Sequence, residues 1–397
     1  MLSKKLKALA VLFLLLFTIV ALIGCGQETP GQESSGDSGP SGSGGGTPAS
    51  GGKIILGWVS PLTGTAANQG QQLLDGANLA VKEINESGGI NGKMLELDPQ
   101  DDKSDPKEAA NIATKFTSDD RILGVVGNYN SSCALAGFPI YNEAGLPMIT
   151  VGTSPVITEQ HGPYCFRLAV TDAFQGKYVT EWLFEDGFSK PAILYENNDY
   201  GRGLMEVVEA EVKNLGGEVA IKETYMMGET KDFTAILTKV KASDADCLFI
   251  AGLYNEGALI TKQARQLGID LPVYSNEALF EQIYIDLAGE AAEGTKVCGL
   301  LVPSDPDPVV QKFFTAYDKE YGKLAGTFSA FGYDMVKIFA RAIEEVGEDR
   351  EKITEYLKNM PEYEGASGRI TFDEEHDAVR PTLKRIIVRN GNFELVQ

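Results

Sequence analysis

The chain has 397 residues, with 56 acidic and 35 basic side chains and a formal net charge of −21. Its Lys and Arg residues are scattered and form no basic stripe, which argues against a nucleic-acid partner. It has two histidines, and its five cysteines form no CxxC pair. It also lacks a Ser-His-Asp set, an HExxH motif and a phosphate-binding loop. These features argue against a metal site, a cofactor and an enzymatic activity.

Residues 1–25 have the pattern of an export signal. Three lysines precede an apolar run over residues 8–23, which is on the short side for a membrane span. The run ends in Leu22-Ile-Gly-Cys25, which resembles a bacterial lipobox, so we expect cleavage before Cys25 and lipid attachment to it. An uncleaved anchor with an incidental cysteine is the alternative. Either way, the chain is expected outside the cytoplasm and attached to the bacterial membrane.

Residues 26–52 consist almost entirely of Gly, Ser, Pro, Thr, Gln and acidic residues. Such a composition cannot form a packed core and predicts a flexible tether. The remaining residues, 53–397, are numerous enough for two lobes.

Short apolar runs then alternate with segments of helical period. Predicted strands cover 53–59, 94–97, 122–126, 148–151, 192–195, 221–225, 247–251, 273–277, 369–372 and 385–389. Predicted helices cover 71–86, 107–118, 133–143, 172–184, 204–215, 232–241, 257–267, 309–321, 329–346 and 351–359. This alternation predicts an α/β fold with parallel sheets and right-handed crossovers.

The pattern occurs twice, which predicts two doubly wound, Rossmann-like lobes. We expect lobe 1 to comprise residues 53–171 and 303–363, and lobe 2 residues 172–302 and 364–397. Three crossings, near residues 171, 302 and 364, would then form a hinge between the lobes.

Two polar turns follow neighbouring predicted strands, at residues 127–132 and 152–155. Ligands of open α/β sheets bind at this edge, and a helix that starts there favours an anion. Ser131 and Ser154 add hydroxyl groups, and Gly152 lets a ligand approach the backbone. The turns therefore suggest a carboxylate pocket without a cationic side chain. The alternative is that the serines only cap helices.

Four cysteines lie beyond the export signal. Since an exported chain can form disulfides, Cys133–Cys165 and Cys247–Cys298 are candidate pairs. Four buried free thiols fit the sequence equally well.

Several short motifs occur in a characteristic order. They are Pro61-Leu-Thr-Gly64, residues 83–92 (EINESGGING), Gly145-Leu-Pro-Met-Ile149, Asn198-Asp-Tyr-Gly-Arg-Gly203 and Lys262-Gln-Ala-Arg265. In this order and spacing they resemble the type I periplasmic binding proteins. Specifically, they resemble the leucine/isoleucine/valine-binding receptors of ABC transporters, from about Lys53 to the end of the chain.

The resemblance implies roles for individual residues. Ser131 matches the residue that holds the ligand carboxylate, with Gly152, Thr153 and Ser154 as contacts from the second turn. Glu277 matches the acid that binds the ligand ammonium group.

Five further positions complete the implied site. Tyr200 and Phe328 match aromatic residues that close on the ligand, and Gln69 occupies a position that often holds an aromatic or small residue. Asp172 is either a hinge or a ligand residue. Where such receptors carry a Tyr, this chain has Leu253, with Tyr254 beside it, and either could face the ligand.

The resemblance implies an ABC-importer receptor that captures a small, branched-chain amino acid by hinge closure. Its expected partners are the amino acid, the permease subunits and the membrane, and a monomer is expected. Two alternatives keep the same scaffold. One binds an amide, urea or aromatic acid, and the other acts as a ligand sensor.

Overall fold

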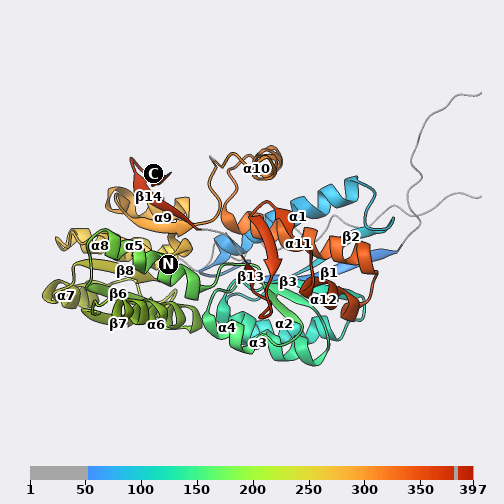
Figure 1. Cartoon of the computed structure of the whole chain (residues 1–397), viewed down its shortest axis with the longest axis horizontal. Coiled ribbons are helices and arrows are strands. Elements are labelled where there is room, and N and C mark those ends of the chain that lie inside the picture. The colour runs from blue at the N-terminus through green and yellow to red at the C-terminus, as the bar shows by residue number, and fades with distance from the viewer. Residues whose placement is uncertain (1–51, 304, 380–382, 397) are drawn as a thin grey trace, which may run out of the picture. The chain divides into compact units, whose positions relative to one another are not determined.

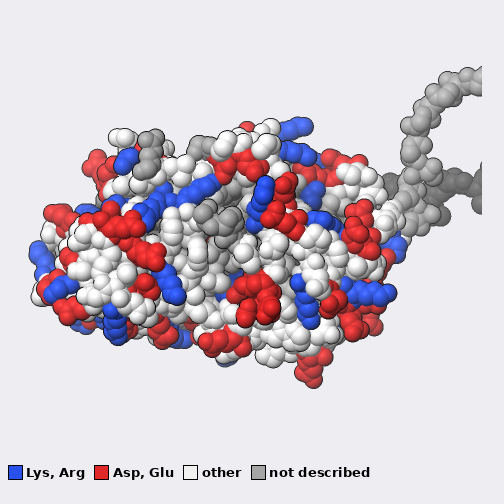
Figure 2. All heavy atoms as spheres, in the orientation of Figure 1, with Lys and Arg blue, Asp and Glu red and all other residues white. Residues whose placement is uncertain are grey.

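The computed structural model describes residues 52–303, 305–379 and 383–396 (Figure 1). The predicted export signal, the predicted lipid-attachment residue Cys25 and the predicted tether up to residue 51 lie outside these ranges. Within them, no helix combines the length and the apolar character needed to cross a bilayer. On the face shown in Figure 2, acidic and basic side chains are interspersed and form no continuous basic stripe.

The first lobe contains a five-stranded, fully parallel sheet in the order β2-β1-β3-β4-β5. Its strands are β1 (Lys53–Ser60), β2 (Met94–Asp101), β3 (Ile122–Gly127), β4 (Met148–Thr150) and β5 (Cys165–Arg167). Its helices are α1 (Ala67–Glu86), α2 (Pro106–Thr117), α3 (Ser131–Glu143), α4 (Pro155–Gln160), α10 (Pro308–Tyr321), α11 (Thr327–Val346) and α12 (Arg350–Lys358). The strand order reverses at β1, and ligands of such sheets bind at the carboxyl ends of the strands near this point.

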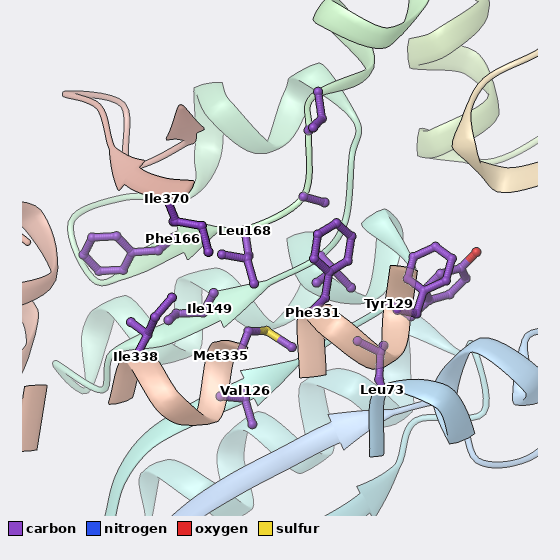
Figure 3. Close-up of a cluster of buried hydrophobic side chains, with 14 of the residues drawn as sticks. Leu73, Val126, Tyr129, Ile149, Phe166, Leu168, Phe331, Met335, Ile338 and Ile370 are labelled. Carbon is purple, nitrogen blue, oxygen red and sulfur yellow. The ribbon is translucent and has the colours of Figure 1, made fainter. Parts of the chain in front are cut away.

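Both faces of this sheet are covered by helices, as the buried, mainly apolar strands β1, β3 and β4 require. Val126 and Trp58 belong to the core on the side of α1 and α11, whereas their neighbours Val125 and Val59 pack with α2 and α3. Figure 3 shows Phe331 and other α11 side chains directed at the first of these faces. Because Val59 and Val125 pack with α3, this helix, which follows β3, is held against the sheet.

The second lobe contains a seven-stranded sheet in the order β15-β14-β10-β9-β8-β6-β7. Its strands are β6 (Pro191–Glu196), β7 (Ile221–Tyr225), β8 (Cys247–Ala251), β9 (Val273–Ser275), β10 (Lys296–Gly299), β14 (Lys384–Arg389) and β15 (Asn392–Leu395). Strands β14 and β15 are antiparallel to their neighbours, and the others are parallel. Its helices are α5 (Asp172–Glu185), α6 (Asp199–Asn214), α7 (Thr234–Ala242), α8 (Tyr254–Gln266) and α9 (Gln282–Ala288), with 3₁₀ turns η1 (Glu277–Leu279) and η2 (Gly289–Ala292).

A small antiparallel sheet follows α12. It consists of β11 (Tyr363–Gly365), β12 (Gly368–Phe372) and β13 (Ala378–Val379). A buried ion pair attaches the turn before β13 to β5, because Arg167 Nε donates to Asp377 Oδ1 at 2.7 Å. Arg167 also donates to the carbonyl of Ser154 at 2.8 Å, so this pair also supports the turn after β4.

Several helices begin earlier than the sequence predicts. Helix α1 starts at residue 67 rather than 71, α3 at 131 rather than 133, α6 at 199 rather than 204 and α11 at 327 rather than 329. At α6 the reason is a cap, since the Asn198 side chain accepts a hydrogen bond from Gly201 N at 2.8 Å. Residues predicted to lie in turns thus form first helical turns.

The cysteine alternatives are resolved. Cys133, Cys165, Cys247 and Cys298 are all buried free thiols. The candidate pairings Cys133–Cys165 and Cys247–Cys298 are therefore wrong, and the four thiols serve as small apolar core residues.

Candidate ligand-binding site

The two predicted turns meet at the carboxyl edge of the first sheet. Ser131 Oγ accepts hydrogen bonds from the backbone N–H groups of Thr153 and Ser154, both at 3.2 Å. Gly152 permits this contact, because a Cβ there would lie 3.1 Å from Ser131 Cα and 2.7 Å from a methyl group of Ile157. The Ser131 hydroxyl is therefore fixed in position, and its own proton remains available for donation.

The start of α3 is arranged to receive an anion. Asn130 is the N-cap residue, but its side chain makes no capping hydrogen bond to the first turn. The first N–H groups of a helix lack partners within the helix, and the helix dipole favours negative charge beside them. Together with the Ser131 hydroxyl, this helix start can hold a carboxylate.

A cavity opens beside Ser131, between the two lobes. The side chains and backbone that line it come from both lobes. The lining residues are Tyr129, Asn130, Ser131, Val151, Thr153, Ala169, Gln175, Tyr200, Leu253, Asn276, Glu277, Ala278 and Phe328.

Glu277 is the only carboxylate among the described residues that line the cavity, and these lining residues include no Lys or Arg. The side chain is 4% exposed and lies at the first position of η1, just after β9. Gln175 fixes this position, since its Oε1 accepts from Glu277 N at 3.1 Å and its Nε2 donates to the carbonyl of Val170 at 2.9 Å. A carboxylate held at low exposure is suited to a cationic group on a ligand.

A chain of hydrogen bonds passes behind the cavity from one lobe to the other. Tyr200 OH donates to Asn276 Oδ1 at 3.0 Å, and Asn276 Nδ2 donates to Asp172 Oδ1 at 3.1 Å. Thr153 Oγ1 donates to the second oxygen of Asp172 at 2.9 Å. Burial raises the pKa of Asp172 to about 7, although these hydrogen bonds and Arg167 favour the charged form. Asp172 thus joins two lining residues.

The rest of the cavity wall is largely apolar or aromatic. The rings of Tyr129 and Phe328 meet edge to face, with centroids 5.0 Å apart. Leu253 and Val151 add aliphatic surface. Burial raises the pKa of the Tyr129 and Tyr200 hydroxyls, so both remain protonated at neutral pH. The wall can therefore accept an apolar side chain.

The structure brings half of the residues named from the sequence to the cavity. Ser131, Thr153, Tyr200, Glu277 and Phe328 line it. Each lies at the start of a helix or 3₁₀ turn or, for Thr153, just before one. The edge of the sheet thus gathers residues that are far apart in the sequence.

The other five named residues lie outside the lining. Gly152 serves the contact between the two turns, and Asp172 lies one layer behind the cavity. Ser154 is buried with its side chain near Gly203, and Gln69 is fully buried on α1. Tyr254 packs in the core of the second lobe. Of the adjacent pair, Leu253 is therefore the residue that reaches the cavity.

Sequence reasoning missed Tyr129, Asn130, Gln175 and Asn276, together with the small residues of the wall. Tyr129 and Asn130 lie within the predicted first turn, and Asn276 precedes Glu277, so proximity to named residues was an available signal. Gln175 lies inside α5, three residues after Asp172, but its role depends on its contact with the distant Glu277.

Among the described residues, no group of three or more His, Cys, Asp or Glu side chains could hold a metal ion.

The cavity presents hydrogen-bond donors on one side, a carboxylate on another and apolar surface between them. This combination suits a small zwitterion with an apolar side chain.

Comparison with known proteins agrees with this geometry. A sequence profile of the periplasmic binding proteins matches residues 53–383. The leucine-, isoleucine-, valine-, threonine- and alanine-binding protein of Pseudomonas aeruginosa is 32% identical over 328 residues, covering 82% of this chain and 86% of the relative.

Two solved structures are also similar. The leucine-binding protein LivK of Thermotoga maritima has 30% identity and a TM-score of 0.81, covering 87% of this chain and 98% of its own. The branched-chain amino-acid transporter substrate-binding protein LivJ of Streptococcus pneumoniae, in complex with isoleucine, has 30% identity and a TM-score of 0.80, covering 87% and 99%.

Proposed function

The chain belongs to the periplasmic binding protein family, and from that premise we propose that it is the extracytoplasmic receptor of an ABC importer for a branched-chain α-amino acid. Members of this family bind solutes and are not enzymes. Each relative described above is named for binding leucine or branched-chain amino acids. The ligand would be captured between the lobes and passed to the permease.

One observation carries the ligand assignment. The anion-binding start of α3 and the carboxylate of Glu277 line the same small cavity. An α-amino acid has a carboxylate and an ammonium group on one carbon atom, so it can use both sites at once. Tyr129, Leu253 and Phe328 would surround its aliphatic side chain, and burial of that apolar surface would add affinity.

We assign the remaining positions to supporting roles. Asp172 is hydrogen-bonded to Thr153 and Asn276, and it would keep the first-lobe and second-lobe residues of the site in fixed relative positions. Gly152 and Ser154 would position the Ser131 hydroxyl, Gln69 would support the wall from behind, and Tyr254 would stabilise the second lobe.

The receptor would be a monomer attached to the membrane by a lipid on Cys25. The lipobox-like sequence before Cys25 supports this, and the tether over residues 26–52 would give the binding part reach. The two lobes, with boundaries near residues 171, 302 and 364, would close on the ligand as a hinge. The permease would recognise the closed form.

The test is a calorimetric titration of the full chain in detergent, after unfolding and refolding to remove carried ligand. The twenty amino acids and a set of amides and aromatic acids would be compared. We expect binding of leucine, isoleucine or valine. Binding confined to non-amino acids, or no binding at all, would refute the assignment. Palmitate incorporation at Cys25, with Cys25→Ser as the control, tests the anchor.

A further inference from the structure

The two lobes meet directly beside the cavity, along a seam between α6 of the second lobe and the starts of α3 and α4 in the first. Ser132 Oγ donates to Asp199 Oδ2 at 2.6 Å. Ser132 follows the cavity residue Ser131, and Asp199 precedes the cavity residue Tyr200. The seam therefore joins the helix start that carries Ser131 to the helix start that carries Tyr200.

Gly203 lies within this seam, in the second turn of α6. A Cβ at this position would lie 2.9 Å from Ser154 Oγ and 2.9 Å from Pro155 Cδ. Both atoms belong to the first lobe, as does the third nearest atom, Ser154 Cβ at 3.7 Å. Neither neighbour can easily move, because the proline ring is rigid and Ser154 is fully buried.

The neighbouring glycine of the same helix has a different role. A Cβ on Gly201 would lie 2.3 Å from the carbonyl oxygen of Glu196, which is in its own lobe. Gly201 is thus required by the fold of the second lobe itself. At Gly203 the three nearest atoms all come from the opposite lobe, although glycine is unfavourable inside a helix relative to alanine.

A second contact between the lobes has the same character. A Cβ on Gly228 would lie 2.6 Å from the Thr65 methyl group, and Asn255 Nδ2 donates to Thr65 O at 2.9 Å. Bare backbone thus faces the other lobe at two separate places. Glycine at these two positions allows the lobes to approach closely, and any larger side chain there would break the contacts.

We propose that Gly203 sets how far the lobes close, and that it thereby controls affinity without touching the ligand. This rests on the proposed function, in which closure traps the ligand. Since carbon atoms in contact lie about 3.5–4.0 Å apart, a methyl group here would hold α6 back by roughly 1 Å. That displacement would separate Ser132 from Asp199 and withdraw Tyr200 from the cavity.

The test compares Gly203→Ala and Gly203→Val with a matched control, Glu206→Ala, at an exposed position of the same helix. Affinity for leucine would be measured on the full chain in detergent, together with the ligand-free melting temperature. We expect Gly203→Ala to lower affinity about tenfold and Gly203→Val to lower it further. The ligand-free melting temperature of Gly203→Ala should equal or exceed that of the wild type, because alanine is the better helix former.

Two results would overturn the proposal. One is unchanged affinity in both Gly203 variants. The other is a loss of affinity accompanied by a lower ligand-free melting temperature in Gly203→Ala, which would mean that Gly203 is needed for packing within the folded chain.

A wild-type chain that binds no amino acid would refute the proposed function separately. The seam would then be judged by hydrogen exchange of the ligand-free protein in the first turns of α3 and α6. Faster exchange confined to these turns in Gly203→Val would support the proposal, and equal exchange, or faster exchange throughout the second lobe, would overturn it.

Discussion

Replacing Glu277 by glutamine removes one negative charge from the wall of the cavity and keeps the shape of the side chain. The backbone N–H of Glu277, which Gln175 holds, is unaffected by the change. We therefore expect the fold to be retained and the binding of an α-amino acid to weaken. The loss should be specific to ligands that carry an ammonium group.

The size of the effect follows from the surroundings of Glu277. The side chain is 4% exposed, and no Lys or Arg is among the described residues of the cavity wall. A charge-assisted hydrogen bond in such a place contributes about 1.5–3 kcal/mol. Since about 1.4 kcal/mol corresponds to tenfold in affinity, Glu277→Gln should raise the Kd for leucine about 10- to 100-fold.

The assay is calorimetric titration with leucine, with Glu211→Gln as the matched control. Glu211 is also buried in the second lobe, but it accepts a hydrogen bond from Asn214 of the same helix and lies outside the cavity wall. Its variant should bind leucine within about threefold of the wild type. Equal affinities of the wild type and Glu277→Gln would refute the ammonium role, as would equal losses in the two variants.

Four further variants test the carboxylate site and its supporting structure. Ser131→Ala should weaken leucine binding about tenfold. Ser154→Ala changes a side chain outside the cavity wall and should bind leucine normally. Equal affinities of these two variants for leucine would contradict the carboxylate site. Arg167→Met leaves Asp377 buried without its cation. Denaturant titrations should show that the free energy of unfolding falls by about 3–5 kcal/mol. A change below about 1 kcal/mol would refute a structural role for the Arg167–Asp377 pair. Burial raises the pKa of Glu196 to about 7. The folded chain therefore binds more protons at this residue than the unfolded chain does. The contribution of Glu196 to stability should fall as the pH rises from 6 to 8. Glu196→Gln should reduce that fall in melts across this range, and an unaltered slope would contradict the assignment.

The architecture could be read from the sequence because its signals are local. Apolar runs such as 122–126 alternate with helical segments, and this alternation specifies a parallel sheet with ligand turns at one edge. Ser131 could be named because it follows such a strand, whereas only the resemblance to the binding-protein family singles out Glu277. The early helix starts were missed because capping by residues such as Asn198 depends on backbone geometry, which the sequence shows only as a polar cluster.

The rest of the site depends on contacts between distant segments. Gln175 lies within a helix, and nothing near it in the sequence indicates that it supports Glu277. The partner of Arg167 lies 210 residues away in the turn before β13. Similarly, the contact of Gly203 with the first lobe exists only once the lobes have met. Such residues resemble ordinary core or turn residues until the fold brings their partners together.

The most direct test of the account compares leucine with two analogues, each lacking one charged group. In 2-hydroxy-4-methylpentanoate a hydroxyl replaces the ammonium group, and in leucinamide an amide replaces the carboxylate. Calorimetric titration of the refolded chain should give binding of leucine and a loss of about tenfold or more for each analogue. Equal binding of the hydroxy acid would contradict the role of Glu277, and equal binding of leucinamide would contradict the carboxylate site at Ser131.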